Sequence, residues 1–89
     1  MTEITTLTRI TVRFFAAARA AAGTDSSAQT LQPGATVADL VRELSAQSEE
    51  MALVLRKCTF LCDGIAVRDS RTVLQANQTL DVLPPFAGG

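Results

Sequence analysis

The chain has 89 residues, of which 47% are hydrophobic and 19% are charged, with eight basic against nine acidic side chains. This length favours one small domain. Because the sequence contains no histidine, a histidine base, a histidine metal ligand and a Ser-His-Asp triad are excluded. The net charge of −1 and the lack of a basic run argue against nucleic acid and anionic membranes as partners.

The two cysteines, Cys58 and Cys62, stand four positions apart, which fits neither a Cys-x-x-Cys redox motif nor a recognisable zinc site. We expect them to be buried thiols in a reducing cytosol. The first residues, Met1–Leu7, contain no basic segment that leads into an apolar run, so no signal peptide is expected. No apolar stretch approaches the roughly 20 residues of a membrane span. We therefore expect a cytoplasmic protein with no membrane partner.

The first part of the chain is typical of a strand, a helix and a second strand. Arg9–Phe15 alternates with a period of two and is rich in β-branched residues, which predicts a half-buried strand. Ala16–Ala22 is rich in alanine and predicts a short helix, which Gly23 would end. Ser26–Gln32 predicts the second strand, ended by a turn at Pro33-Gly34.

The clearest helix signal follows this turn. Thr36 is the predicted N-cap, and Asp39 three positions later completes a variant of the capping box. Behind the cap, apolar residues recur at helical spacing and predict one continuous stripe: Val37, Leu40, Val41 and Leu44. Glu49–Lys57 repeats this spacing briefly, which predicts a second, shorter helix. The stripe requires a sheet on which to pack.

The last third returns to strand character. Thr59–Val67 predicts two strands joined at Asp63-Gly64, a strong hairpin signal because both turn residues need positive φ. Arg68–Gln78 predicts a loop that tucks Val73 and Leu74 inward, and Thr79–Leu83 predicts the closing strand. The order of elements predicts an α+β fold in which one sheet is covered on one face by the capped helix. We expect the first and last strands to lie side by side at its centre.

The last residues form a distinctive tail. Pro84 and Pro85 lack backbone donors and favour a short polyproline II rod. Gly88 and Gly89 have no Cβ, so they can enter a slot that a side chain would block. One interpretation is a reactive terminus that an enzyme encloses, and the other is a frayed end.

Three segments together resemble a known family. They are Ile10–Arg19 followed by Gly23, the capped helix after Ala35, and the ending Leu83–Gly89. Their sequences are similar to those of the small, sulfur-carrier subunit of molybdopterin synthase, which is a ubiquitin-like β-grasp protein. The resemblance implies a mixed sheet of four to five strands, one main helix on one face and short additional helices. It also implies a flexible leader at 1–8, a domain at 9–83 and an extended tail at 84–89. The turn at Ala76–Thr79 and the residue Phe86 depart from the family pattern.

The resemblance implies a mechanism centred on the carboxylate of Gly89, which is reached through Gly88. An adenylating, ubiquitin-activating-like enzyme uses ATP to form an acyl-adenylate. A persulfide sulfur donor then converts this acyl-adenylate to a thiocarboxylate. The large catalytic subunit of molybdopterin synthase takes up the tail, and sulfur passes to cyclic pyranopterin monophosphate. The chain itself binds no cofactor, and a heterotetramer with a dimeric large subunit is expected.

Strand alternation predicts where partners dock. Phe15, Leu61 and Leu83 should point away from the helix, so we expect an apolar interaction patch on that face. The alternative is that a loop or the first helix covers them. Arg13 shares this face. Its two alternative roles are a rim charge that steers docking and a solvated side chain, and we expect the second. The tail would also contact partners, through Pro84, Pro85, Phe86 and Ala87.

Other functions stay open at this point. The chain is also compatible with a sulfur carrier for thiamine or cysteine synthesis, or with a ubiquitin-like modifier of lysines. A third hypothesis is a β-grasp interaction module with an inert tail. A redox role for Cys58 and Cys62 is the weakest hypothesis, because their spacing matches no redox motif.

Overall fold

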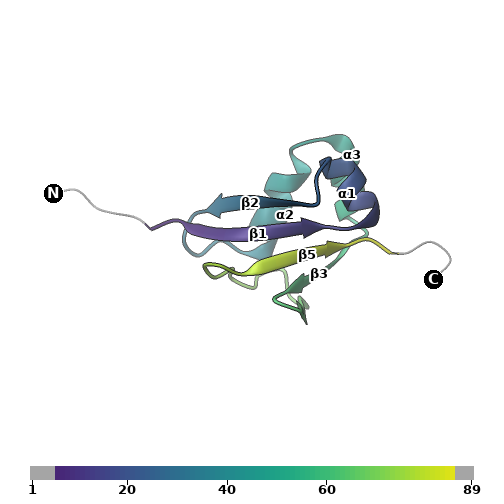
Figure 1. Cartoon of the computed structure of the whole chain (residues 1–89). Helices are drawn as coiled ribbons and strands as arrows, with labels where there is room; N and C mark the ends of the chain where they lie inside the picture. Colours follow the sequence, from purple (N-terminus) through teal and green to yellow (C-terminus); the bar gives the residue numbers. More distant parts are fainter. Residues whose placement is uncertain (1–5, 86–89) are drawn as a thin grey trace.

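The helices and strands lie in one layer each, as Figure 1 shows for a computed structural model of the chain, which describes residues 6–85. Five strands form one sheet, and the helices cover one of its faces. In chain order the elements are β1 Thr8–Phe14, α1 Ala16–Ala22, β2 Ser26–Leu31, α2 Val37–Ser45, α3 Glu49–Leu55, β3 Thr59–Cys62, β4 Ile65–Ala66 and β5 Thr79–Leu83. The predicted α+β fold is confirmed.

The sheet has the strand order β2-β1-β5-β3-β4. The two central strands, β1 and β5, run parallel, with a register from Thr11 opposite Thr79 to Phe14 opposite Val82. All other neighbouring strands are antiparallel. The prediction that the first and last strands lie side by side at the centre is therefore confirmed.

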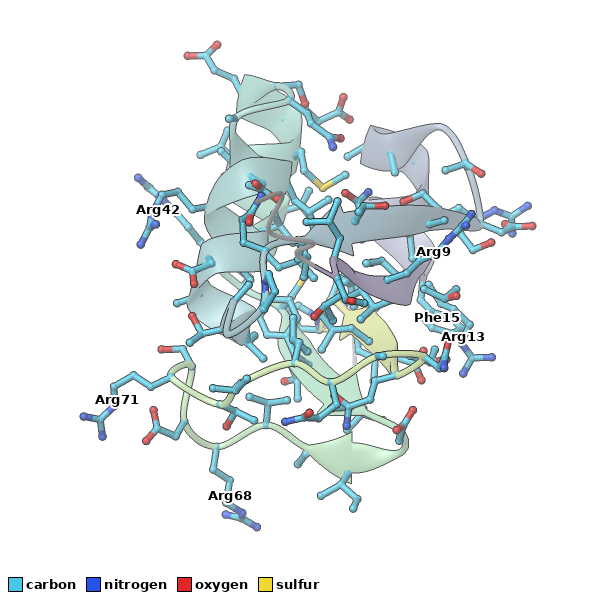
Figure 2. The ribbon with its side chains drawn as sticks, turned by 90° about the vertical axis from the view of Figure 1, so that its left-hand side faces the viewer. Arg9, Arg13, Phe15, Arg42, Arg68 and Arg71 are labelled. Atoms are coloured by element: carbon cyan, nitrogen blue, oxygen red, sulfur yellow. The ribbon has the colours of Figure 1, made fainter. Side chains whose placement is uncertain are left out.

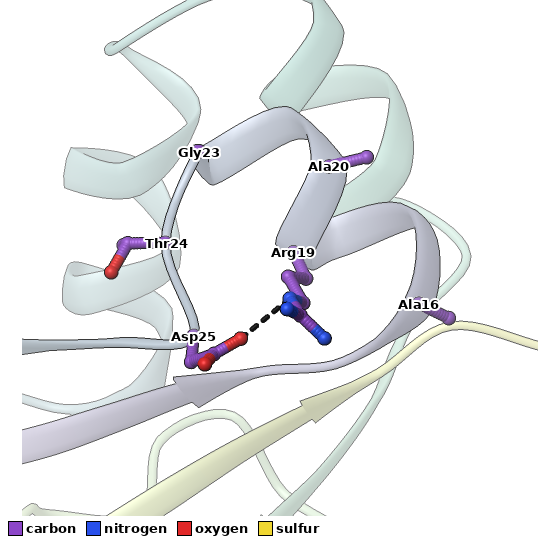
Figure 3. A pocket seen from close by; sticks show the side chains of 6 residues that line it. All are labelled: Ala16, Arg19, Ala20, Gly23, Thr24 and Asp25. Carbon is purple, nitrogen blue, oxygen red and sulfur yellow. Dashed lines mark ion pairs between the residues drawn. The ribbon is translucent and has the colours of Figure 1, made fainter.

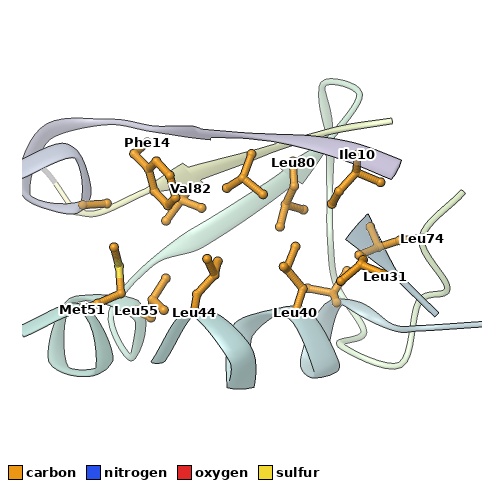
Figure 4. Close-up of a cluster of buried hydrophobic side chains, with 13 residues drawn as sticks. Ile10, Phe14, Leu31, Leu40, Leu44, Met51, Leu55, Leu74, Leu80 and Val82 are labelled. Carbon is orange, nitrogen blue, oxygen red and sulfur yellow. The ribbon is translucent and has the colours of Figure 1, made fainter. Parts of the chain in front are cut away.

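The core lies between the sheet and the helices (Figure 4). Alternate residues of the central strands point into it, and the apolar stripe of α2 meets them from the other side. The largest side chains that are almost wholly buried are Ile10, Leu40, Leu44, Met51, Leu74 and Leu80. Burial of each such side chain favours the folded state by roughly 1.5–3 kcal/mol, so this layer contributes most of the hydrophobic stabilisation of the fold.

The predicted helix caps are present. The Thr36 hydroxyl accepts a hydrogen bond from the Asp39 N–H at 3.2 Å, and the Asp39 carboxylate accepts one from the Thr36 N–H at 2.9 Å. This reciprocal pair is the capping box. Gly23 ends α1 with a φ of 75°, and its N–H donates to the Arg19 carbonyl. Ser48 caps α3, which ends at Leu55, two residues before its predicted end.

Two predicted boundaries shift at the ends of β1. The strand begins at Thr8, which pairs with Leu31, one residue before its predicted start at Arg9. The flexible leader at 1–8 stays a prediction. Residues 1–5 of that leader lie outside the described residues. The strand stops at Phe14, because Phe15 serves as the N-cap residue of α1.

The segment 68–78 follows the prediction in part. Leu74 is buried, as expected, but Val73 is exposed. Val73 bridges Thr36 as an isolated antiparallel pair, and neighbouring residues in extended backbone point to opposite sides. Asn77 has a φ of 68°, and its N–H donates to the Arg9 carbonyl. Asn tolerates this left-handed conformation better than most residues, which suits the departure from the family turn.

Candidate functional site

The face of the sheet that carries no helix is formed by the residues that alternate with the core. In the three central strands it places Arg13 opposite Asp81 and Asp81 opposite Leu61. We call this surface the open face. Its side chains point away from α2, and Figure 2 shows Arg13 and Phe15 on the side of the molecule opposite Arg42.

The three apolar residues of the predicted patch all belong to this region. Leu83 follows Asp81 by two positions in β5, and Leu61 lies in β3 next to Asp81. The Phe15 N–H donates to the Val82 carbonyl at 3.2 Å, which holds Phe15 beside the end of β5. Each of the three side chains is half-buried, and the helices lie on the opposite face. Docking through them stays a prediction.

An ion pair at the centre of the open face was not predicted. Arg13 Nε donates to Asp81 Oδ1 at 2.6 Å, and Arg13 Nη2 donates to Asp81 Oδ2 at 2.8 Å. The Asp81 side chain is only 11% exposed, whereas that of Arg13 is 53% exposed. The hydrogen bond to Asp81 and then its charge raise the pKa of Arg13 above its ordinary value. The prediction of a merely solvated Arg13 is therefore wrong.

The ring of Phe15 gives Arg13 a second contact. The guanidinium carbon lies 5.5 Å from the ring centroid, which is a cation–π distance. Arg13 is thus held on one side by a bidentate carboxylate and on another by an aromatic face. Its orientation is fixed although its tip is open to solvent.

The base of the tail is also defined. Pro84 is buried and Pro85 is exposed. Both line a shallow groove with Leu53 and Lys57 of the α3 region. The remaining predicted tail residues, Phe86, Ala87, Gly88 and Gly89, lie outside the described residues.

The cysteines are free thiols that are half-buried. Cys58 Sγ donates to the Val54 carbonyl at 3.2 Å. Burial raises the pKa of Cys58, and burial followed by the charge of Asp63 raises the pKa of Cys62. A thiol with a raised pKa is protonated at neutral pH and is a weak nucleophile, which disfavours a redox or persulfide role.

The hollow beside α1 holds no cluster of reactive side chains. The hollow beside α1 in Figure 3 is lined by small side chains and by an exposed ion pair between Arg19 and Asp25. Exposed pairs of this kind contribute little energy. Within residues 6–85 no three His, Cys, Asp or Glu side chains gather as a metal site. In the same range, no helix has the length and apolar character needed to cross a membrane.

Solved structures define the class of the protein. The Haloferax volcanii HVO 2177 protein is 29% identical, with a TM-score of 0.81 over 93% of this chain and 88% of its own. A putative molybdopterin converting factor subunit 1 from Pyrococcus furiosus is 24% identical, with a TM-score of 0.80 over 89% and 99%. The small archaeal modifier SAMP1 from Haloferax volcanii is 21% identical, with a TM-score of 0.79 over 91% and 99%. The fold is that of the ubiquitin-like β-grasp proteins.

Comparison with protein-family models assigns the chain to a particular family. The model of the ThiS family matches residues 12–89, so the chain belongs to this family of ubiquitin-like sulfur carriers. A search of curated proteins found no match. The protein is therefore a small carrier or modifier of the ThiS family.

Proposed function

We propose that the chain is the sulfur-carrier subunit of molybdopterin synthase and holds sulfur as a thiocarboxylate on Gly89. The family match, which extends through Gly88 and Gly89, supports the sulfur-carrier part of the proposal. The likeness to a putative molybdopterin converting factor subunit 1 favours the molybdopterin pathway. The proposal is also supported by the position of β5, a central strand that ends at Leu83 and continues directly into Pro84.

The chemistry follows from the weak electrophilicity of a carboxylate. An adenylating partner uses ATP to convert the carboxylate of Gly89 to an acyl-adenylate. The terminal sulfur of a persulfide attacks the acyl carbon, and AMP leaves. A thiol then cleaves the acyl disulfide, which releases the thiocarboxylate. In the synthase, this sulfur attacks a carbon of cyclic pyranopterin monophosphate and displaces an oxygen substituent. Water then cleaves the resulting acyl thioester, which leaves the sulfur on the substrate and returns the carboxylate of Gly89.

The chain contributes a handle and a docking surface in this scheme. It has no histidine, and its described cysteines have raised pKa values. Acid-base groups, ATP and the substrate pocket therefore belong to the partners. We propose that the large synthase subunit docks on the open face, with Phe15, Leu61 and Leu83 as apolar contacts, and receives the tail from Pro84 onward. A structural neighbour with 20% identity and a TM-score of 0.65 is named as a protein–protein complex of subunits 1 and 2 of molybdopterin-converting factor from Helicobacter pylori, which supports a large-subunit partner.

Two sulfurs are needed for each dithiolene. Two carriers on a dimeric large subunit meet that need, so the proposed assembly is a heterotetramer. Thiocarboxylate carriers for thiamine or cysteine synthesis would use the same tail chemistry with a different acceptor.

A second candidate is a ubiquitin-like modifier, which the likeness to SAMP1 favours. Mass spectrometry of the protein from its native host separates the two functions. Replacement of one oxygen by sulfur at Gly89 indicates a carrier, whereas Gly-Gly adducts on lysines of other proteins indicate a modifier.

The decisive test is reconstitution of sulfur transfer. A thiocarboxylated chain and the large subunit from the same genome should convert cyclic pyranopterin monophosphate to molybdopterin. A variant that lacks Gly88 and Gly89 should be inactive and should keep its melting temperature, because the hydrophobic core lies within residues 10–82. A second control keeps both glycines but adds one alanine, which moves the carboxylate. Full activity of the shortened chain would refute the proposal.

A further inference from the structure

The Arg13–Asp81 pair leaves one edge of its guanidinium without a partner. A guanidinium carries five N–H donors, and Asp81 takes one from Nε and one from Nη2. Within residues 6–85, no hydrogen bond takes up Nη1. The free edge, formed by Nη1 and the second N–H of Nη2, has the fork geometry that a second carboxylate fits.

The surroundings hold this edge outward. Asp81 is anchored in the central strand β5 and is nearly buried, so it fixes the inner edge of the guanidinium. The Phe15 ring lies beside the guanidinium and limits its tilt. About half of the Arg13 side chain is nevertheless exposed. Arg13 is therefore preorganised toward whatever covers the open face.

When a partner docks on the open face, burial of the free guanidinium edge is unfavourable unless the partner provides a hydrogen-bond acceptor for it. A partner that covers Phe15, Leu61 and Leu83 also removes water from Arg13, which lies on β1, two residues before Phe15 and opposite Asp81. Unpaired buried donors are unfavourable. The charge of the face selects the kind of acceptor. Arg13 and Asp81 neutralise each other, and Arg9 alternates onto the same face of β1 and is exposed. The face thus keeps a positive excess, which complements an acidic group.

We propose that Arg13 is a specificity-determining residue of the open face, whose free edge binds a carboxylate on the large synthase subunit while Asp81 acts as the positioning residue. The inference rests on the proposed function. It adds that the partner surface is not purely apolar but presents an acidic side chain opposite the centre of the sheet.

The test measures the Kd for the purified large subunit from the same genome by titration calorimetry. Arg13→Gln removes the positive charge and the paired N–H donors of the free edge. It should raise Kd by about thirty-fold or more. The exchange Arg13→Asp with Asp81→Arg restores an internal ion pair but reverses which charge points outward. It should stay weak even when its melting curve shows a folded protein.

A matched control exists on another part of the molecule. Arg71 makes the same two-pronged contact with Asp69, at 3.1 and 3.0 Å, far from the open face (Figure 2). The exchange Asp69→Arg with Arg71→Asp should leave Kd within about twofold of the unmodified chain, since that pair is exposed and contributes little. If the exchange at 13 and 81 does not fold, Arg13→Lys keeps the charge but loses the fork, and should weaken binding about tenfold.

The salt dependence of Kd shows whether the acceptor on the partner is charged. If it is a carboxylate, Kd of the unmodified chain should rise more steeply with salt than Kd of Arg13→Gln. Equal salt dependence would indicate a neutral acceptor and overturn the inference. Binding by Arg13→Gln, Arg13→Lys or the exchanged pair that equals the unmodified chain would also overturn it, with the proposed function intact. Failure of the unmodified chain to bind would refute the proposed function, and the inference with it.

Discussion

Single residues near the start of α2 show how one carboxylate stabilises an element. The Asp39 carboxylate accepts a hydrogen bond from the Thr36 N–H, and hydrogen bonding to the backbone and then to the side chain of Thr36 holds the pKa of Asp39 below its ordinary value. The charged carboxylate also lies in the first turn of α2, where the helix dipole favours a negative charge. The half of the capping box in which Asp39 is the acceptor therefore depends on ionisation of one side chain.

We expect the effect of Asp39→Ala on the free energy of unfolding to depend on pH. Because the folded-state pKa is lowered, the contribution is complete above the unfolded aspartate pKa of about 3.9 and is lost as pH falls through the folded value. Urea unfolding at pH values from neutral to strongly acidic should show the difference from the unmodified chain shrinking. Ser48→Ala removes the α3 cap, which uses an uncharged hydroxyl, so its effect should not follow this pattern. A constant difference for Asp39→Ala would contradict the prediction.

At the level of elements, the β3–β4 hairpin shows how a turn fixes two strands and their neighbour. Asp63 and Gly64 have φ values of 48° and 83°, which suits the tight twist of a two-residue hairpin. The Asp63 N–H also donates to the Thr79 carbonyl, and its carboxylate accepts from the Thr79 N–H. The turn thus ties the hairpin to the start of β5.

Replacement of Gly64 by alanine should lower the free energy of unfolding by about 1–2 kcal/mol, the cost of a Cβ in left-handed backbone. No atom lies within 4 Å of the position of that Cβ, so the cost is conformational rather than steric. Gly64→Asn should recover part of the loss, because Asn tolerates this conformation. Urea unfolding measures both. Equal stability of the alanine variant and the unmodified chain would show that the turn is not strained.

The elements could be predicted well because their signals are local. Thr36 with Asp39, Gly23, and Asp63 with Gly64 each act on a few neighbouring residues, and each was placed correctly. The Arg13–Asp81 pair was missed because its residues are 68 positions apart and meet only through the parallel register of β1 and β5. A single acid between Leu80 and Val82 in an apolar strand is the signal that could have indicated a buried charge, and it was not used. The predicted roles of Phe86–Gly89 lie outside the described residues.

The molecule as a whole divides its sheet between two tasks. One face packs against the helices and supplies stability, and the open face carries the half-buried apolar residues and the Arg13–Asp81 pair. The single layer of strands separates them. Changes on one face should therefore affect one property far more than the other.

Two leucines test this division. Leu44→Ala creates a cavity in the core, so the free energy of unfolding should fall by about 2–5 kcal/mol, while Kd for the large subunit stays unchanged at temperatures where the variant is folded. Leu83→Ala should raise Kd about tenfold, with a much smaller effect on unfolding. Urea unfolding and calorimetry on both variants measure the separation. Similar effects of the two substitutions on Kd would show that the faces are not independent.

The parallel pairing of β1 with β5 also determines how the protein withstands force. A pull applied to the chain before Thr8 and after Leu83 draws these neighbouring strands in opposite directions along their length. The hydrogen bonds between parallel strands run across that direction, so they carry the load together instead of opening one after another. An unfolding enzyme that pulls the chain from its carboxyl end would first have to break the hydrogen bonds between β1 and β5 together. The strand that continues into the tail is thus held in shear by its central neighbour.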